Sequence, residues 1–182
     1  ITCVNCGEDH SSSQKWFVVT NGNLLDDPLI AGQVAAPSEK SIELVNEFYI
    51  PAIQDAGIEM GNLRILEIGS GTGNIAYGFG KICKPLVYVA TDAYVQLMDV
   101  LRSNLDLWGL KEPIGWAAGL NADLNIALRP QIFNVVIGHS VLHHVLDYQL
   151  LIRRLNKLLV APGVMLFAEP LRDGWAYFLT II

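Results

Sequence analysis

The sequence has no basic excess, no long apolar run and no visible signal peptide. Its 12 lysine and arginine residues face 18 acidic ones, and the resulting net charge of −6 argues against a nucleic acid partner. No apolar stretch reaches the length of a membrane-spanning helix, so we expect no membrane partner. The chain starts at Ile1 without Met, as a processed product or an excised domain would. We expect a cytoplasmic protein.

A second cysteine pair is also lacking. Cys3 and Cys6 form one C-x-x-C knuckle, His10 follows shortly after, and Cys83 lies far away in the sequence. A structural zinc site ordinarily takes two such knuckles, so only half of a site is present. We favour incidental or half-retained cysteines over an occupied metal site and predict no bound metal. A disulfide across this short loop is the redox alternative.

The most informative feature that is present is an apolar run that breaks into alternating glycines. It extends from Ile65 to Gly73 and reads Ile-Leu-Glu-Ile-Gly-Ser-Gly-Thr-Gly, and Asp92 follows a second strand-like run at residues 87–91. Glycines let the backbone approach a ligand closely, and a carboxylate one strand away can take two hydroxyls of a ribose. The pattern predicts a nucleoside pocket at the carboxyl ends of parallel strands.

This glycine motif departs from the dinucleotide-binding fingerprint. The fingerprint G-x-G-x-x-G wants its last glycine where the sequence has Asn74. Glu67, at the end of the first strand, would repel a diphosphate, whereas a zwitterionic or cationic ligand would tolerate or use it. The motif therefore favours a nucleoside ligand without a diphosphate and counts against a nicotinamide-dependent oxidoreductase.

Three segments resemble the class I S-adenosylmethionine-dependent methyltransferases, in that family's order. Residues 67–73 resemble motif I, residues 133–145 resemble the fourth strand with its following loop, and residues 159–170 resemble the turn into the fifth strand. The resemblance implies an α/β fold with a Rossmann-like, doubly wound, mostly parallel sheet flanked by helices. It also implies S-adenosyl-L-methionine as cofactor and S-adenosyl-L-homocysteine as product.

The resemblance implies where the cofactor would lie. The backbone of Gly69 and Gly71 would face its methionine part, and Asp92 would hold the ribose hydroxyls, although Asp92 could instead cap the helix that begins near Ala93. Asp123 or, in its place, Asn121 would accept from the adenine amine. The predicted cofactor-binding residues are Glu67, Gly69, Ser70, Gly71, Gly73, Asp92, Ala93, Asn121, Ala122, Asp123, His139 and Ser140.

The loop after the fourth strand carries the predicted catalytic residues. His143 or His144 could remove a proton from a nucleophile, because imidazole titrates near working pH. Glu169, after the fifth strand, could orient one of them by hydrogen bonding. A His–Glu pair of this kind occurs in carbon-methylating domains of polyketide synthases, which the chain resembles in its Val-Leu-His sequence. In many small-molecule methyltransferases such a histidine only packs or holds the loop, and that alternative stays open.

The strand count leaves the end of the expected fold incomplete. Five strands are predicted, near residues 64–68, 86–91, 114–118, 134–138 and 164–168. The resembling fold normally finishes with a helix and two further strands, so the C-terminal strands are predicted to be missing. A second copy of the chain or a neighbouring domain would then cover the exposed sheet edge. We predict an irregular N-terminal segment at residues 1–37, with the half zinc knuckle, and a C-terminally incomplete methyltransferase domain at residues 38–182.

The function predicted from these observations is transfer of a methyl group to oxygen, nitrogen or carbon of a small-molecule acceptor. Two alternatives remain open. The chain could be a non-catalytic methyltransferase-like scaffold domain of a larger protein, which the incomplete sheet would suit. Less favoured is an NAD(P)-dependent oxidoreductase, because of Glu67 and the missing third fingerprint glycine.

Overall fold

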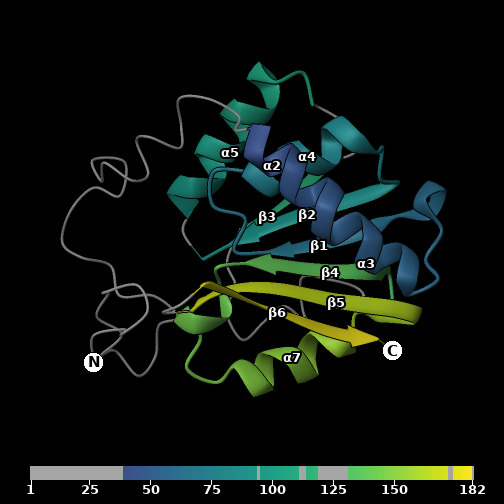
Figure 1. Cartoon of the computed structure of the whole chain (residues 1–182). Coiled ribbons are helices and arrows are strands. Elements are labelled where there is room, and N and C mark those ends of the chain that lie inside the picture. Colours follow the sequence, from purple (N-terminus) through teal and green to yellow (C-terminus); the bar gives the residue numbers. More distant parts are fainter. Residues whose placement is uncertain (1–38, 94, 111–113, 119–130, 172–173, 182) are drawn as a thin grey trace.

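The computed structural model describes residues 39–93, 95–110, 114–118, 131–171 and 174–181 (Figure 1). Six strands form one sheet with the order β3-β2-β1-β4-β5-β6. The strands are β1 (Arg64–Ile68), β2 (Val87–Asp92), β3 (Ile114–Ala118), β4 (Phe133–His139), β5 (Leu159–Leu171) and β6 (Gly174–Ile181). The helices are α2 (Glu39–Leu44), the π-helical turn η2 (Val45–Tyr49), α3 (Ile50–Asp55), α4 (Asn74–Ile82), α5 (Val95–Leu107) and α7 (Tyr148–Asn156), with short 3₁₀ turns η3 (Met60–Asn62) and η4 (Leu142–His144).

Five of the six strands are parallel, as the alternation of strand and helix patterns predicts. β1 pairs with β2 and β4, β2 pairs with β3, and β4 pairs with β5, all in parallel. Parallel neighbours need helical crossovers, and these crossovers cover the sheet with helices. The predicted α/β Rossmann-like fold is confirmed.

The predicted count of five strands is short by one. Residues 174–181 form β6, which pairs antiparallel with β5 and places Tyr177 opposite Ala168 and Ile181 opposite Val164. An antiparallel strand needs only a short turn from its neighbour, so the chain reaches the sheet edge directly after β5. One strand beyond the fifth is therefore present at this edge.

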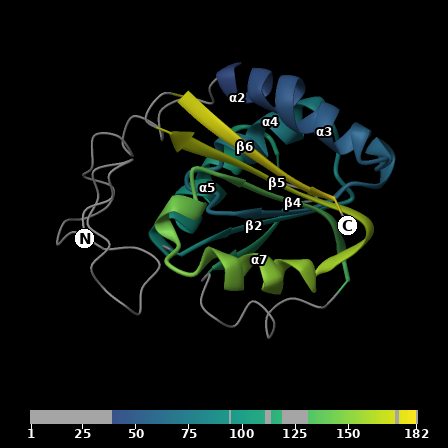
Figure 2. The same ribbon diagram turned by 60° about the horizontal axis from the view of Figure 1, so that its bottom comes forward.

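Alternating apolar residues of the strands divide the core into two layers. Ile65 of β1 packs in one cluster with the helices α3, α4 and α5, whereas the next residue, Leu66, packs in the other cluster with α7. Figure 2 shows α2, α3 and α4 on one side of the sheet and α7 on the opposite side. Because successive side chains of a strand point to opposite faces, a continuous apolar run fills both layers.

Residues 39–55 form one helical run that continues through Pro51. The run changes from α2 through the π-helical turn η2 to α3, and Pro51 lies in the first turn of α3. A proline is tolerated there because the first N–H groups of a helix have no partner within the helix. The helix ends before Gly57, whose φ is +74°. The helical run therefore ends ahead of Gly57 and not at Pro51.

Within the described residues, no helix is both long and apolar enough to cross a membrane.

Candidate functional site

The candidate site lies at the carboxyl ends of β1 and β4, where the strand order reverses. β1 is followed by a crossover to β2 on one side, whereas β4 lies on its other side. In open α/β sheets this switch point opens a crevice, because the two connections leave the sheet in opposite directions. The glycine loop after β1 and the turn after β4 meet here.

Left-handed backbone shapes the glycine loop between β1 and α4. Gly69, Gly71 and Gly73 have φ values of +68°, +53° and +96°, which residues with a side chain rarely adopt. A Cβ on Gly69 would lie 2.6 Å from Val141 Cγ2, whereas one on Gly71 would meet nothing within 4 Å. The loop therefore packs closely on the turn after β4 at Gly69 and leaves open space at Gly71.

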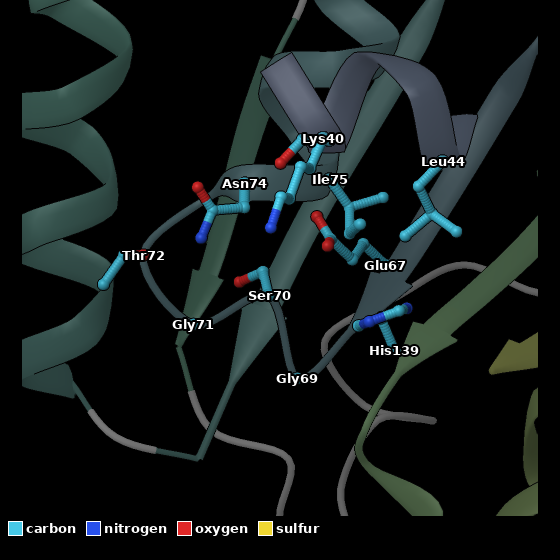
Figure 3. Close-up of a pocket in the computed structure, with 11 residues that line it drawn as sticks. Lys40, Leu44, Glu67, Gly69, Ser70, Gly71, Thr72, Asn74, Ile75 and His139 are labelled. Atoms are coloured by element: carbon cyan, nitrogen blue, oxygen red, sulfur yellow. The ribbon is translucent and has the colours of Figure 1, made fainter. Parts of the chain in front are cut away.

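A cavity of about 320 Å³ lies between this loop and α2. Figure 3 shows side chains from α2, β1, the glycine loop, the start of α4 and the end of β4 around it. Ser70 Oγ, Thr72 Oγ1 and Asn74 Oδ1 are buried and have no hydrogen-bond partner among the described residues. Because buried polar groups are nearly always paired in folded proteins, these three atoms indicate a polar ligand. The lining residues are Lys40, Ser41, Leu44, Glu67, Gly69, Ser70, Gly71, Thr72, Asn74, Ile75 and His139.

Glu67 carries a buried carboxyl group into this cavity. Its Oε2 accepts a hydrogen bond of 2.8 Å from the Tyr88 hydroxyl. The pKa of Glu67 is raised to about 8, chiefly by burial, with an opposing contribution from the Tyr88 hydrogen bond and a reinforcing one from the nearby charge of Asp92. At neutral pH the group is therefore mostly protonated, and a cation placed beside it would favour the ionised form.

Asp92 connects the end of β2 to the glycine loop. Its Oδ2 accepts a hydrogen bond of 2.8 Å from the backbone N–H of Gly71, and the residue is buried. The predicted proximity of this carboxylate to the glycine loop is thus present, and Ala93 follows directly after β2. The role of Asp92 toward a ribose stays a prediction. The predicted adenine residues Asn121, Ala122 and Asp123 lie outside the described residues.

His139 is the last residue of β4 and Ser140 follows it, and the two residues lie in different environments. His139 lines the cavity, and its Nδ1 lies 3.4 Å from the Tyr49 hydroxyl. Burial lowers the pKa of His139, although Glu169 opposes this, so the ring is neutral at neutral pH. Ser140 has a φ of +55°, and its N–H donates to the carbonyl of Ala168 at 2.7 Å. It begins the loop from β4 to η4 and is not among the residues that line the cavity.

A histidine–glutamate pair lies beside this turn. His143 Nδ1 is 2.6 Å from Glu169 Oε2, and both side chains are nearly buried. The backbone amides of Val141 and Leu142 donate to Glu169 Oε1 at 3.0 and 2.8 Å. Burial would raise the pKa of Glu169, but the hydrogen bonds from His143 and the backbone outweigh burial and lower it. Glu169 is therefore ionised at neutral pH.

Of the predicted catalytic residues, His143 and Glu169 are brought together, and His144 stacks beside them. The rings of His143 and His144 have centroids 3.9 Å apart and are tilted by 42°. The hydrogen bond to Glu169 is made by the ring of His143. Glu169 comes from β5, and both histidines come from η4, which follows β4. The parallel pairing of β4 with β5 therefore brings them together.

Several residues at the site were missed in the sequence analysis. Lys40 and Ser41 of α2, Thr72, Asn74 and Tyr88 contact the cavity or its carboxylate. Asn74 carried a signal, because it replaces the expected fingerprint glycine with a polar side chain that lines the pocket. Lys40 carried none, because a lysine in an amphipathic helix ordinarily faces water.

Of the cysteine residues discussed above, Cys83 lies in the part of the chain that the structure describes. Cys3, Cys6 and His10 lie outside the described residues. Cys83 is a free thiol at the end of α4, half-buried against the core, and burial raises its pKa to about 11. In the part of the chain that the structure describes, no three histidine, cysteine or acidic side chains gather as a metal site would require.

Known proteins share this architecture. A family model described as a methyltransferase domain matches residues 38–177, which is more than half of the chain. No curated protein matches the chain significantly in sequence. The strand order, the glycine loop and this match define the class, and the chain belongs to the methyltransferase domain family. Its fold is that of the class I S-adenosylmethionine-dependent methyltransferases, and S-adenosylmethionine is the cofactor of that class.

Solved structures similar to the chain show the fold alone, because their sequences are distant. A protein of Methanococcus maripaludis assigned as an S-adenosylmethionine-dependent methyltransferase is 16% identical, with 84% of this chain and 67% of that chain covered and a TM-score of 0.61. The CurJ carbon methyltransferase is 18% identical, with 80% and 37% covered and a TM-score of 0.58. The O-methyltransferase TomG from Streptomyces achromogenes, solved with S-adenosylmethionine, is 16% identical, with 74% and 57% covered and a TM-score of 0.54. The chain thus spans about a third to two thirds of the length of these proteins.

Proposed function

We propose that the chain transfers a methyl group from S-adenosylmethionine to a small-molecule acceptor, with His143 as the base that takes the proton of the acceptor. The observation that carries this proposal is the 2.6 Å hydrogen bond between His143 Nδ1 and Glu169 Oε2. It lies at the carboxyl edge of the sheet, beside the turn that packs on Gly69. The pair therefore adjoins the cofactor side of the site.

The protonation of Glu169 determines the tautomer of His143. An ionised carboxylate can only accept hydrogen bonds, so the Nδ1 atom of His143 must carry the proton in the short contact. The other ring nitrogen, Nε2, then has an unprotonated lone pair. A neutral imidazole held in this tautomer can accept a proton at Nε2, and the imidazolium that forms is stabilised by the negative charge of Glu169.

The remainder of the site contributes mainly alignment. The cofactor supplies an electrophilic sulfonium methyl group, so the reaction needs positioning and, for a protonated nucleophile, a base. The glycine loop and Asp92 hold one side of the site through the Gly71 N–H hydrogen bond. Glu169 holds the other side, because it fixes the backbone of Val141 and Leu142 together with the His143 ring.

A small-molecule acceptor is favoured by charge. The net charge of −6 gives no attraction for the phosphate backbone of a nucleic acid, whose binding depends on basic residues. The acceptor atom is proposed only as oxygen, nitrogen or carbon. Both an O-methyltransferase and a carbon methyltransferase occur among the similar structures, and a His–Glu base can serve a hydroxyl or an acidic C–H.

The proposal is tested by methyl transfer from labelled S-adenosylmethionine to a panel of phenol, amine and β-keto thioester acceptors. His143→Gln is expected to lose at least about a hundredfold in rate, and His144→Gln, a matched change in the adjacent ring, is expected to lose much less. Binding of S-adenosylhomocysteine should stay within about twofold in both variants, which corresponds to a small change in free energy.

Two results would contradict this assignment. Equal rates in His143→Gln and wild type would exclude His143 as the base. Binding of S-adenosylmethionine without transfer to any acceptor class would instead support the scaffold alternative, in which the domain keeps the cofactor without catalysing transfer.

A further inference from the structure

We propose a second binding site at the opposite edge of the sheet, where the guanidinium group of Arg64 binds the carboxylate of a small, partly apolar monocarboxylic acid. The site is a cavity of about 320 Å³, which is within the range of small-molecule pockets. It lies at the amino ends of β1 and β4, which begin at Arg64 and Phe133. It is therefore separate from the candidate site for methyl transfer, which lies at the carboxyl ends of these strands.

A buried asparagine fixes the frame of this cavity. Asn134, the second residue of β4, accepts a hydrogen bond of 2.8 Å at Oδ1 from the backbone N–H of Arg64. Its Nδ2 donates a hydrogen bond of 2.7 Å to the backbone carbonyl of Asn62, the last residue of η3. The Asn134 side chain thus ties the turn before β1 to β4, and it holds the backbone of Arg64 at the cavity wall.

Apolar residues form another part of the wall. Residues 160–162 near the start of β5 line the cavity together with Ile58, which is buried. A Cβ on Gly163 would lie 2.4 Å from the backbone carbonyl oxygen of Val160, so the turn is too tight for a side chain at this position. A ligand in the cavity would therefore contact a fixed apolar surface as well as Arg64.

The Arg64 side chain supplies a donor that has no acceptor. Its Nε atom is buried and has no hydrogen-bond partner among the residues that the structure describes. Buried polar atoms nearly always have a partner in folded proteins, so this N–H indicates an acceptor that a ligand would supply. A guanidinium group presents its N–H donors as a planar fork, which matches the two oxygens of a carboxylate.

The charges around the cavity favour a carboxylate over a phosphate. Arg64 is the cation and Glu59 is the acid among the lining residues, and Glu59 is exposed. A ligand with a single negative charge can pair with Arg64, whereas the second charge of a phosphate would be repelled by Glu59. The apolar part of the wall would contact a hydrocarbon body. An aromatic or short-chain monocarboxylate fits both requirements.

The site can be tested with benzoate as the probe, observed through the arginine Nε–Hε signals in ¹H–¹⁵N NMR spectra of the full chain. Benzoate should shift the Arg64 signal in a saturable manner, because the carboxylate would accept a hydrogen bond from this N–H. Benzamide has the same ring without the charge and should bind at least about tenfold more weakly. Inorganic phosphate should also bind more weakly than benzoate. The Arg64 signal can be assigned through bonds from the backbone, so this measurement needs no variant.

Substitutions separate the Arg64 contact from a general attraction to positive charge. Arg64→Gln should weaken benzoate binding about tenfold or more, measured by the shift of the Ile58 backbone amide signal. Arg153→Gln removes the same charge from an exposed position on α7 and should leave the affinity within about twofold. Arg64→Lys keeps the charge without the planar fork and should retain only part of the affinity. The backbone amide spectrum shows whether each variant is folded.

Three results would overturn this site. The first is an Arg64 signal that does not move with benzoate in the folded wild-type protein, as expected for a cavity that holds only water. The second is binding of benzamide or phosphate as strong as that of benzoate. The third is an equal loss of benzoate affinity in Arg64→Gln and Arg153→Gln. Binding of S-adenosylhomocysteine should stay within about twofold in Arg64→Gln, so a failure of this site is distinguishable from a failure of the proposed function.

Discussion

Two buried glutamates at the same edge of the sheet have opposite pKa shifts. Glu67 lies near the end of β1 in the cavity beside the glycine loop, and Glu169 lies on β5 in the pair with His143, with exposed fractions of only 2% and 5%. Burial favours the neutral form of both carboxyl groups. Yet the pKa of Glu67 is raised to about 8, whereas that of Glu169 lies below its usual value.

Hydrogen bonds explain the difference. Glu169 accepts from the His143 ring and from three backbone amides, which stabilise its negative charge. Glu67 accepts one hydrogen bond, from Tyr88, and has the acidic Asp92 nearby. A pair of titratable groups with separated pKa values lets one site carry two kinds of chemistry. Glu169 can act as a permanent anion that orients a base. Glu67 can act as a group that becomes charged when a cation binds beside it.

The largest effect is expected from removing the permanent anion. In Glu169→Gln the side-chain carbonyl can still accept from the backbone, but its amide NH₂ would donate to Nδ1 of His143. The ring would then carry its proton on Nε2 and could not accept one there. We expect at least about a hundredfold loss of methyl transfer, measured with the same acceptor panel.

The tautomer of His143 provides a readout independent of activity. Imidazole ¹⁵N NMR should show the proton on Nδ1 in the wild-type protein and on Nε2 in Glu169→Gln. An unchanged tautomer together with lost activity would contradict the orienting role of Glu169.

The second largest effect is expected from a substitution at Gly69, where the glycine loop after β1 packs against the turn after β4. In Gly69→Ala the new methyl group would overlap Val141, whose N–H donates to Glu169, and would force an alanine to a φ of +68°. Left-handed strain and overpacking together should lower the free energy of unfolding by about 2–4 kcal/mol.

Gly71→Ala is the matched control, because its φ is also positive but its Cβ would meet nothing within 4 Å. It should cost about 1 kcal/mol in stability. Equal stability losses for the two variants in urea unfolding would show that the contact with Val141 is unimportant.

Removing the carboxyl group of Glu67, whose pKa is raised, should change how the free energy of unfolding depends on pH. The folded protein holds the proton of Glu67 up to about pH 8, whereas a free glutamate has a pKa of 4.5. The resulting stabilisation is present below pH 4.5 and is lost as the pH rises toward 8, by at most about 1.4 kcal/mol per pH unit. Glu67→Gln, which stays neutral, should remove this decline from the urea unfolding curves.

Glu169→Gln should have the opposite pH signature. The pKa of Glu169 is lower in the folded protein than in the unfolded chain. The ionised carboxylate therefore stabilises the folded protein at pH values above the pKa of the unfolded chain, and this stabilisation is lost as the pH falls through the pKa of the folded state. The two variants should therefore differ from wild type in separate pH ranges, near neutrality for Glu67 and in acid for Glu169. Differences confined to one common range would contradict the contrast between the two groups.

The sequence predicted the features that depend on local pattern. Apolar runs predicted the strands, and the glycines at 69, 71 and 73 predicted a loop whose backbone a ligand can approach closely, because these signals lie within single segments. The family resemblance supplied the His143–Glu169 pair, whose members are 26 residues apart. Parallel pairing of β4 with β5 brings them together, and such long-range pairing cannot be read from spacing alone.

Other features were hidden for physical reasons. Only two residues separate the sixth strand from β5 in the sequence, and the strand carries little alternation to mark it. Lys40 is exposed in the manner of any surface lysine, and its place above the cavity follows from the packing of Ser41 on Gly78. The pKa of Glu67 depends on burial by neighbouring elements, which no local pattern encodes.

At neutral pH the buried Glu67 is mostly neutral, whereas the buried Glu169 is ionised, and this difference underlies the proposed chemistry. The most direct measurement is a ¹³C NMR titration of side-chain carboxyl carbons in protein labelled at glutamate Cδ, with Glu67→Gln and Glu169→Gln for assignment. Tyr88→Phe provides a small further test, because loss of its hydrogen bond should move the Glu67 midpoint upward. We expect a Glu67 midpoint near pH 8 and a Glu169 carboxylate that remains ionised below pH 4.5. Two glutamates that titrate together near pH 4.5 would contradict the difference between these two groups.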